Sequence, residues 1–253
     1  MINNPVMNNI VSLSGGKDST AMLLMMLERN EPIHSVVFFD TGWEFPEMLE
    51  HIEKLKTYVW DKYQLKIWTL HPRLPFEYLL LHKHIKSRKG DNKGEFHRNG
   101  TGWPAMMRRW CTSQKTDTLN YYAKFVQNAC SCVGYAKDEE NRKFHDEKIR
   151  HRFPLVEWGI TEAQALEYCY GKGFDWDGLY NHFSRVSCFC CPLQKLSELK
   201  KIRLYFPVLW NKMLEWDAAQ PSHNQGFYGT KSVHALDRRF AEEDRQGGMF
   251  DDI

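Results

Sequence analysis

Six consecutive residues near the N-terminus carry the groups that a phosphate-binding loop needs. The stretch is Ser14-Gly15-Gly16-Lys17-Asp18-Ser19. Its glycines allow a sharp turn that brings backbone N–H groups close to a ligand, its lysine adds a positive charge, and its serine hydroxyls can contact phosphate oxygens. The spacing differs from the G-x-x-x-x-G-K-S/T loop that holds the β- and γ-phosphates in common nucleoside triphosphatases. We therefore expect an anion site of another type, with a simple Asp-Ser helix cap as the alternative.

The residues on either side of this loop are those of a strand and a helix. Residues 9–13 form a short apolar run that predicts a buried strand, and residues 20–27 form an apolar run of helix-forming residues. A helix that begins at the loop adds its positive N-terminal end to the anion site. Strands at 35–39 and 66–70, with a helix that reaches to about residue 63, complete the β-α-β-α-β order of a doubly wound, mostly parallel sheet.

An acidic residue follows the second predicted strand. It is Asp40, and Thr41 and Gly42 come directly after it. Ligands of open parallel sheets lie beyond the carboxyl ends of the strands, so we expect Asp40 to lie beside the first loop. Its carboxylate suits a Mg²⁺ ion or a ribose hydroxyl. A plain cap of the following helix is the alternative.

Three of the seven cysteines are clustered late in the chain. Cys188 and Cys191 form a C-x-x-C pair that is followed by Pro192, and Cys190 stands between them. Such a pair can offer two thiolates to one metal centre. Three ordinary thiols at the start of a helix are the alternative. Cys111 indicates little by itself, because a single cysteine is often a small buried hydrophobe.

Residues 82–102 are rich in Lys, Arg and His, which stand among glycines and polar residues. We expect this segment to be a long surface loop. Its charge suits either a lid over a phosphate-rich substrate or an arm that contacts a nucleic-acid backbone. A solvated basic loop without such a role is equally consistent with the pattern.

Together these motifs resemble the PP-loop ATP pyrophosphatase superfamily, and within it the phosphoadenylylsulfate (PAPS) reductase branch. The resemblance is carried by residues 14–19, by the run Phe-Phe-Asp-Thr-Gly-Trp-Glu-Phe-Pro-Glu at 38–47, by the Gly-x-x-x-x-Glu-x-x-Arg pattern from Gly134 to Arg142, and by Arg185-x-x-Cys188-x-x-Cys191-Pro192. It implies an α/β fold of the adenine nucleotide α-hydrolase-like type. It also implies that the loop holds the pyrophosphate part of ATP and that cleavage between the α- and β-phosphates adenylates a substrate.

The resemblance also assigns roles to individual residues. Lys17, Asp18 and Asp40 are expected to take part in catalysis. The expected nucleotide-binding residues are Ser12, Ser14, Gly15, Gly16, Lys17, Asp18, Ser19, Asp40, Thr41, Gly42, Glu139, Arg142 and Arg185. Cys111, Cys188 and Cys191 are expected to bind an iron–sulfur cluster of the 4Fe-4S type, or alternatively Zn²⁺, with one coordination position open, and Cys190 as a fourth ligand would close the site. ATP and Mg²⁺ complete the expected cofactors.

Composition sets limits on the class of protein. The 253 residues are enough for a nucleotide-binding α/β domain, expected at 1–183, and a cysteine-containing helical C-terminal lobe, expected at 184–253. With 34 Lys plus Arg against 32 Asp plus Glu, nucleic-acid binding would have to come from local patches. There is no apolar run of about 18 residues and no secretory signal, and the odd cysteine number suits a reducing compartment, so we expect a cytoplasmic protein without membrane contact.

One departure from the PAPS reductase branch directs the functional expectation. True sulfonucleotide reductases end in a Cys-Gly motif whose cysteine attacks the bound sulfonucleotide, whereas no cysteine follows Cys191 in this sequence. We therefore expect adenylation followed by sulfur transfer. Among the enzymes of this branch, those that serve DNA phosphorothioation fit this expectation best, which implies DNA or RNA as substrate and a cysteine desulfurase or another sulfur donor as partner. The alternatives are a PAPS or APS reductase-like small-molecule enzyme, transfer-RNA thiolation, and a non-enzymatic nucleotide-binding subunit.

Overall fold

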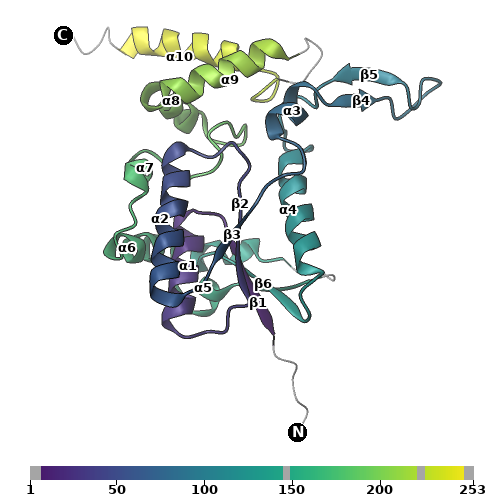
Figure 1. The fold of residues 1–253 in the computed structure, drawn as a ribbon. Helices are drawn as coiled ribbons and strands as arrows, with labels where there is room; N and C mark the ends of the chain where they lie inside the picture. The colour runs from purple at the N-terminus through teal and green to yellow at the C-terminus, as the bar shows by residue number, and fades with distance from the viewer. Residues whose placement is uncertain (1–6, 145–148, 221–225, 248–253) are drawn as a thin grey trace. The chain divides into compact units, whose positions relative to one another are not determined.

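Residues 7–144, 149–220 and 226–247 are described by the computed structural model of the protein. They fall into two units (Figure 1). Unit 1 comprises Met1–Pro72 and Gln114–Ser187, and unit 2 comprises Arg73–Ser113 and Cys188–Ile253. This division differs from the expected boundary between residues 183 and 184, because residues 73–113 group with the C-terminal part of the chain.

Unit 1 is built on a five-stranded sheet with the order β3-β2-β1-β6-β7. The strands, all paired in parallel, are β1 (Asn8–Leu13), β2 (Ser35–Phe39), β3 (Ile67–Leu70), β6 (Ala129–Val133) and β7 (Arg150–Arg152). From β1 the chain builds outward through β2 and β3 and then crosses back to β6 and β7. The strand order therefore reverses between β1 and β6, which confirms the predicted doubly wound sheet. In such sheets ligands bind at this reversal, beyond the carboxyl ends of the strands.

Helices cover both faces of this sheet (Figure 1). On one face, α1 (Lys17–Glu28) packs against β1 and α6 (Glu162–Gly171), and α2 (Pro46–Tyr63) lies beside α1. On the other face, the end of α4 (Trp110–Ala123) packs through Ala123 against Ile10 and Val37. All residues of β2 are buried, as expected of a parallel strand that is covered on both sides.

Short elements complete unit 1. They are η1 (Lys137–Arg142), α5 (Pro154–Glu157), η2 (Trp176–Gly178) and α7 (Leu179–His182). The start of α6 is a capping box, in which the Thr161 hydroxyl accepts the Gln164 N–H (3.3 Å) and the Gln164 side chain accepts the Thr161 N–H (3.0 Å). The whole arrangement is the expected adenine nucleotide α-hydrolase-like α/β fold.

Unit 2 combines residues 73–113 with the C-terminal helices. Its elements are α3 (Phe76–Leu81), β4 (His84–Lys86), β5 (Phe96–Asn99), the first residues of α4, α8 (Leu196–Tyr205), α9 (Pro207–Ala219) and α10 (Val233–Gly247). Trp103 lies in its core, where its ring is 4.9 Å from that of Phe227 and its indole N–H donates to Asp217 Oδ1 (3.1 Å). These contacts explain why residues 73–113 group with the C-terminal helices. Within the described ranges, no helix has both the length and the apolar character needed to cross a membrane.

The basic segment 82–102 forms a β-hairpin, so the expectation of a long loop was wrong. β4 and β5 pair antiparallel, with His84 opposite Asn99 and Lys86 opposite Phe96. The strands have three and four residues and are mostly polar, so they lack the alternating apolar pattern by which a strand is recognised. Gly94, at a φ of 93°, helps the chain to turn between them.

Gly134 directly follows β6 and packs against the start of α1. A Cβ atom at this position would lie 2.8 Å from Ser19 Cα and 2.9 Å from Ser19 N. Because these are backbone atoms, no side-chain rotation can relieve the overlap. Only glycine therefore permits the observed approach of β6 to the loop after β1.

We expect Gly134→Ala to lower the free energy of unfolding by about 1–3 kcal/mol, because the added methyl group must displace the start of α1. Urea unfolding of both proteins measures this difference. Gly171→Ala is the matched control, since a Cβ atom there meets nothing within 4 Å and the residue ends a helix. Equal destabilisation by the two substitutions would contradict the packing argument.

Candidate functional site

The loop 14–19 closes on itself through its two serines. The Ser19 hydroxyl donates to the Gly16 carbonyl (3.1 Å) and accepts the Ser14 N–H (3.1 Å), and it lies 2.9 Å from the Ser14 hydroxyl. Gly15 turns at a φ of 86°, where a side chain would meet Met48 Sδ at 2.5 Å. The N-cap of α1 is Gly16 and no side chain caps the helix, so the alternative of an Asp-Ser cap is not adopted.

Three side chains from residues 169–180 form hydrogen bonds with the backbone of the loop. Trp176 Nε1 donates to the Gly15 carbonyl (2.7 Å), and the Tyr180 hydroxyl accepts the Lys17 N–H (2.8 Å). The thiol of Cys169 donates to the Lys17 carbonyl (3.5 Å). Trp176 has a φ of 53°, a left-handed conformation that costs energy for a bulky residue. Tertiary contacts therefore fix the loop in addition to its glycines.

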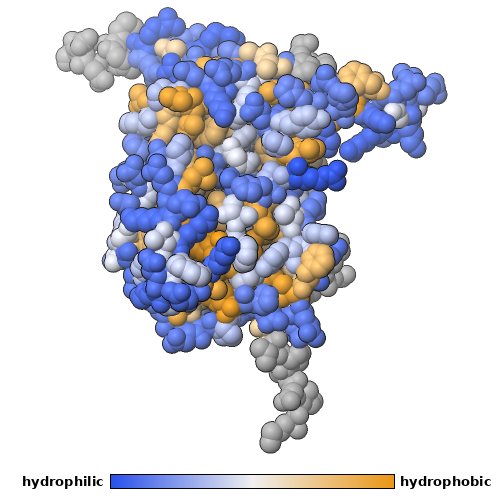
Figure 2. Space-filling model, viewed as in Figure 1, coloured by the Kyte–Doolittle hydropathy of each residue, from blue (hydrophilic) through white to orange (hydrophobic). Residues whose placement is uncertain are grey.

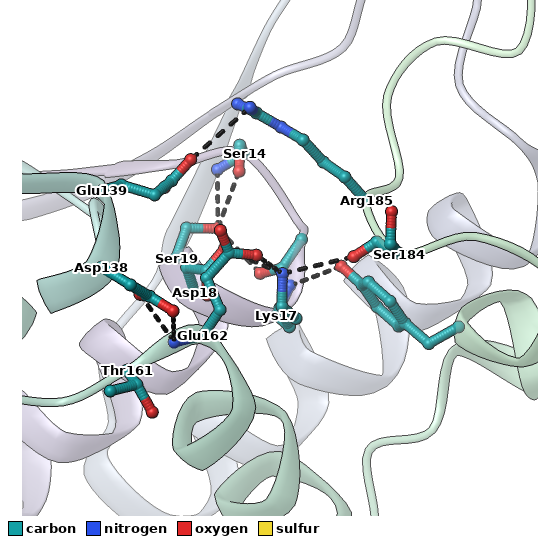
Figure 3. A network of polar contacts seen from close by, with 12 residues as sticks. Ser14, Lys17, Asp18, Ser19, Asp138, Glu139, Thr161, Glu162, Ser184 and Arg185 are labelled. Carbon is teal, nitrogen blue, oxygen red and sulfur yellow. Dashed lines mark hydrogen bonds and ion pairs between the residues drawn. The ribbon is translucent and has the colours of Figure 1, made fainter. Parts of the chain in front are cut away.

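The ammonium group of Lys17 is buried among acceptors (Figure 3). Its side chain is 5% exposed, and Nζ lies 2.5 Å from Glu162 Oε2 and 3.4 Å from Asp18 Oδ2. Nζ also donates to the Ser184 carbonyl (3.5 Å) and lies 5.6 Å from the centre of the Tyr180 ring. A charge that is so far removed from water requires partners of this kind.

Glu162 reaches Lys17 because two elements fix its backbone. It is the first residue of α6, next to the cap Thr161, and its N–H donates to Asp138 Oδ1 (3.0 Å) of η1. Figure 3 shows the contact between Asp138 and Glu162, with Thr161 at the same helix start. Carboxylates are favoured at this end of a helix by its unpaired N–H groups. η1 and α6 together therefore position the carboxylate that pairs with Lys17.

Asp18 belongs to the same group of charges and carries an unusual carboxyl group. Burial raises its pKa from 3.8 to about 6, against the attraction of Lys17, and the charges of Glu162 and Glu139 raise the pKa further. Its Oδ1 atom is buried and has no hydrogen-bond partner among the described residues. A buried carboxylate oxygen that receives no proton donor is suited to a cation.

Glu139 lies between two arginines. It forms an ion pair with Arg142, and Arg185 Nη1 is 3.5 Å from Glu139 Oε1. The Arg142 guanidinium also lies over the ring of Tyr135, 4.6 Å from its centre. The Arg185 side chain is 60% exposed, whereas that of Glu139 is 13% exposed. Arg185 therefore remains accessible to an anionic ligand while one end of it is held beside the loop, as Figure 3 shows.

Asp40 lies at the end of β2, on the sheet edge where the loop follows β1. Its carboxylate accepts the Gly42 N–H (2.7 Å) and lies 3.7 Å from Nδ1 of the exposed His71. α2 begins only at Pro46, with Phe45 as its N-cap, so Asp40 does not serve as the helix cap that was the alternative. A role of Asp40 beside the loop stays a prediction.

Unit 2 contains the C-x-x-C pair and two further cysteines, Cys190 and Cys111. The Cys191 N–H donates to the Cys188 carbonyl (3.1 Å), and the Gln194 side chain donates to the same carbonyl (2.8 Å). Cys190 is fully buried, and burial raises its pKa well above the usual value. The charges of Cys188, Cys191 and Cys111 raise its pKa further.

This set of donors suits a thiolate-bound metal centre, although its geometry is not that of a closed site. Cys111, Cys188 and Cys191 are half-buried, in contrast to Cys190. Among the residues that the structure describes, no three His, Cys, Asp or Glu side chains are arranged to hold a metal ion. The ligand set Cys111, Cys188 and Cys191 therefore stays a prediction.

A cavity of about 820 Å³ in unit 2 adjoins the segments that carry these thiols. Residues 105–108, shortly before Cys111, line one part of it, and residues 192–194, directly after Cys191, line another. The remaining lining residues are 226–230, including the aromatic Phe227 and Tyr228. The lining combines apolar residues with polar ones such as Arg108 and Gln194, as in cavities that bind small molecules.

The structure brings most of the predicted nucleotide-binding residues together in unit 1. Loop residues contact one another and Glu162, and the ion pair of Glu139 with Arg185 lies beside them (Figure 3). Ser12 lies within β1, directly before the loop, and Asp40, Thr41 and Gly42 follow the neighbouring strand. The three predicted metal ligands belong to unit 2.

Sequence reasoning missed the residues that support the loop. Glu162, Asp138, Trp176 and Tyr180 all act on loop residues or on one another, yet Glu162 and Lys17 are 145 positions apart. The cap at Thr161 signals that a helix begins at residue 162. No local pattern indicates which loop that helix start faces, because only the fold brings the two together.

Comparisons with known proteins identify the family of the chain. The model of the phosphoadenosine phosphosulfate reductase domain family matches residues 8–194, which is more than half of the sequence. Two proteins of Methanocaldococcus jannaschii are similar: uncharacterized protein MJ0066, 29% identical over 83% of this chain and 41% of its own length, and uncharacterized protein MJ0973, 25% identical over 81% and 46%. The chain therefore spans less than half the length of these curated relatives.

A solved structure gives a weaker match. The U34-tRNA thiolase NcsA from Methanococcus maripaludis, with its 4Fe-4S cluster, is similar with a TM-score of 0.45 and 13% identity, over 93% of this chain and 72% of that one. A similarity of this size supports no inference about function.

The buried carboxyl of Asp18 gives stability a specific pH dependence. The pKa of Asp18 is higher in the folded than in the unfolded protein. Between about pH 4 and pH 6 the folded state therefore holds a proton that the unfolded state has lost. The contribution of Asp18 to stability falls as pH rises through that window. Asp18→Asn should therefore be more stable than the original protein at neutral pH, by up to about 3 kcal/mol, with the gain vanishing below pH 4. Urea unfolding across this pH range measures it.

The control for this experiment is Asp61→Asn. Asp61 is exposed on α2, and its substitution removes the same charge from the protein. A stability difference for Asp18→Asn that does not change with pH would show that burial of the carboxylate is not its cause.

Proposed function

Because the chain belongs to the phosphoadenosine phosphosulfate reductase domain family, we propose that it acts as a PP-loop ATP pyrophosphatase that adenylates a substrate for sulfur incorporation. The family comprises nucleotide-dependent, sulfur-related enzymes. The observation that carries the proposal is the environment of Lys17, whose buried ammonium stands in a glycine turn at the point where the strand order reverses. That is where an open parallel sheet binds its ligand.

The residues of the site suit a polyphosphate. The loop after β1 and the N-terminus of α1 direct backbone N–H groups to the carboxyl edge of the sheet, and the Ser14 hydroxyl lies at the exposed side of the loop. Lys17 would exchange part of its contact with Glu162 for a phosphate oxygen. Arg185, held at one end by Glu139, would contact the outer part of the phosphate chain.

The balance of charge around the loop favours a divalent cation with the nucleotide. Lys17, Arg142 and Arg185 face Asp18, Glu139 and Glu162, so the positive charges there are already matched by carboxylates. Adding a triphosphate leaves excess negative charge. Asp18, whose Oδ1 is buried without a hydrogen-bond partner in the described residues, fits a Mg²⁺ ion that also binds phosphate oxygens. Asp40 would contact the ribose or the same ion.

The proposed reaction is a transfer of the adenylyl group. An oxygen of the substrate attacks the α-phosphorus of ATP, the bond from that phosphorus to the bridging oxygen of the β-phosphate breaks, and pyrophosphate leaves. Lys17 offsets the negative charge that develops on the phosphate oxygens. In a second displacement, sulfur at the oxidation level of sulfide takes the place of the activated oxygen, and AMP leaves with that oxygen. A direct sulfide donor would supply this sulfur, or a cysteine desulfurase would, provided that a pair of thiols reduces its persulfide to sulfide and is itself oxidised to a disulfide.

The thiols of unit 2 would handle the sulfur. Cys111, Cys188 and Cys191 are the residues that would hold an iron–sulfur cluster or a zinc ion, and such a centre with an open coordination position can carry a sulfur atom. Cys190 is fully buried whereas the other three are half-buried, which favours a packing role over that of a fourth ligand. The adjoining cavity, lined by Phe227 and Tyr228, would receive the part of the substrate that accepts sulfur.

We propose nucleic acid as the substrate, with DNA phosphorothioate modification as the reaction, in a cytoplasmic protein. Support comes from the resemblance of the motifs to the enzymes of that pathway and from the concentration of basic residues in one hairpin of unit 2. Sulfonucleotide reduction and transfer-RNA thiolation are the competing reactions. Each predicts a different product, so one assay separates them.

Lys17→Met should lower the rate of AMP formation from ATP by at least about 100-fold, because it removes the buried cation that faces the phosphates. The assay follows ATP labelled at the α-phosphate, with Mg²⁺, oligonucleotide and a sulfide source, and separates AMP from ADP. Lys172→Met is the control, since Lys172 pairs with Glu28 on the surface and should leave the rate unchanged. ADP as the product would refute α–β cleavage, and thiol-dependent sulfite release from PAPS would identify a reductase instead.

Purification without oxygen should yield iron and acid-labile sulfide, both lost in Cys188→Ala, because this change removes one of three thiolate ligands. Metal and sulfide analysis of the same sample measures this, independently of activity. Cys130→Ala, which removes a buried thiol from β6, is the control and should retain both. Zinc alone would give the alternative centre, and absence of any metal from the unaltered protein would show that these thiols are structural.

A further inference from the structure

The hairpin formed by β4 and β5 is a strongly basic segment of the described chain. Residues 82–99 contain two acids, Asp91 and Glu95, and six Lys or Arg residues, namely Lys83, Lys86, Arg88, Lys89, Lys93 and Arg98. The protein as a whole is almost neutral, so this local excess is not a consequence of overall composition. A charge excess confined to one element indicates an anionic partner at that element.

These cations are available to a ligand. All except Arg98 are exposed, and within the described residues none of the six takes part in an ion pair. By contrast, the basic residues Lys200 and Arg203 of α8 in the same unit are bound to Asp237, Glu243 and Asp244. Figure 2 shows the hairpin as mostly hydrophilic surface.

An aromatic ring stands exposed among these charges. Phe96 lies in the strand β5, and 63% of this residue is exposed. Its cross-strand partner is Lys86, and its ring lies edge-on to that of His84, with the centroids 5.7 Å apart. An exposed aromatic ring flanked by cations is the arrangement that stacks an unpaired base while neighbouring charges bind its phosphates.

The hairpin is held in a defined conformation. The Ser87 N–H donates to the Glu95 carbonyl (2.9 Å) and the Gly94 N–H to the Ser87 carbonyl (3.0 Å), which close the turn. At the base, the Gly100 N–H donates to the Lys83 carbonyl (2.8 Å). A Cβ atom at Gly100 would lie 2.3 Å from the Leu80 carbonyl oxygen at the end of α3, so the base is packed closely against that helix. A binding element fixed in this way loses little entropy on binding.

We propose that the β4–β5 hairpin binds a single-stranded polynucleotide, with one base stacked on Phe96 and the backbone phosphates bound by Lys86, Arg88, Lys89 and Lys93. The cations account for affinity to any strand and the exposed ring accounts for a preference for unpaired bases. This assignment deepens the proposed function, because it names the element that holds the nucleic acid. An acidic protein segment would satisfy the charges but would give no role to the exposed ring.

The test measures binding of fluorescently labelled oligonucleotides by anisotropy over a range of salt concentrations. Single-stranded DNA, single-stranded RNA and duplex DNA of one sequence serve as probes, and unlabelled polyglutamate serves as competitor. The triple variant Arg88→Ala, Lys89→Ala, Lys93→Ala should bind single strands at least about tenfold more weakly, and the slope of log K against log salt should become shallower by about 2. Phe96→Ala should weaken single-strand binding about tenfold and duplex binding much less.

The matched control is a second triple variant, Lys54→Ala, Lys56→Ala and Lys62→Ala, which removes the same charge from α2 and should bind as the original protein does. Equal weakening of binding by both triple variants would overturn the assignment. So would displacement of the labelled strand by polyglutamate as effective as displacement by the unlabelled oligonucleotide. Preferred binding of the duplex, or no effect of Phe96→Ala, would overturn the stacking part. Relative affinity for DNA and RNA identifies the natural strand.

ATP binding by the hairpin variants separates this inference from the proposed function. The variants should bind ATP as tightly as the original protein, because the hairpin carries none of the loop residues. If the original protein forms no AMP but its oligonucleotide binding depends on the hairpin, the proposed function fails and this inference stands. If AMP is formed and the hairpin variants bind oligonucleotides normally, the proposed function stands and this inference fails.

Discussion

A lysine ammonium that has lost nearly all of its water must be surrounded by acceptors, and this requirement organises unit 1. Lys17 meets it through Glu162, Asp18 and the Ser184 carbonyl, which come from three different parts of the chain. Glu162 in turn needs the start of α6, which Asp138 and Thr161 fix. The polar site therefore depends on the packing of the helices, because a displaced α6 would leave the buried charge of Lys17 without its partner.

The same constraint explains the backbone around the loop. The approach of β6 to α1 is possible only because residue 134 lacks a side chain, and the loop carbonyls and N–H groups are held by Trp176 and Tyr180. Trp176 adopts a left-handed conformation that a large residue rarely takes. Strain of this kind persists when the surrounding contacts outweigh it, and in this protein those contacts bear on the element that would bind phosphate.

The central part of the fold and the loop could be predicted from sequence because their signals are local. Apolar runs marked β1, β2 and β3, the Gly-Gly turn marked the loop, and Thr161 marked the start of α6. The partners of the loop could not be predicted, since the link between Lys17 and Glu162 depends on the path of the whole chain. The hairpin was missed for another reason. Its strands are short and mostly exposed, so their sequence lacks the alternation of apolar and polar residues that predicts a strand.

The pairing of Lys17 with Glu162 also bears on selectivity among the many anions of a cell. A ligand that approaches this lysine does not meet a free cation; it must compete with a carboxylate that is already 2.5 Å away. The gain is then the difference between two ion pairs, which is small for chloride, sulfate or inorganic phosphate. A magnesium-bound polyphosphate offers several contacts at once and can make up the difference. The carboxylate thus sets a threshold of ligand charge below which the loop stays unoccupied.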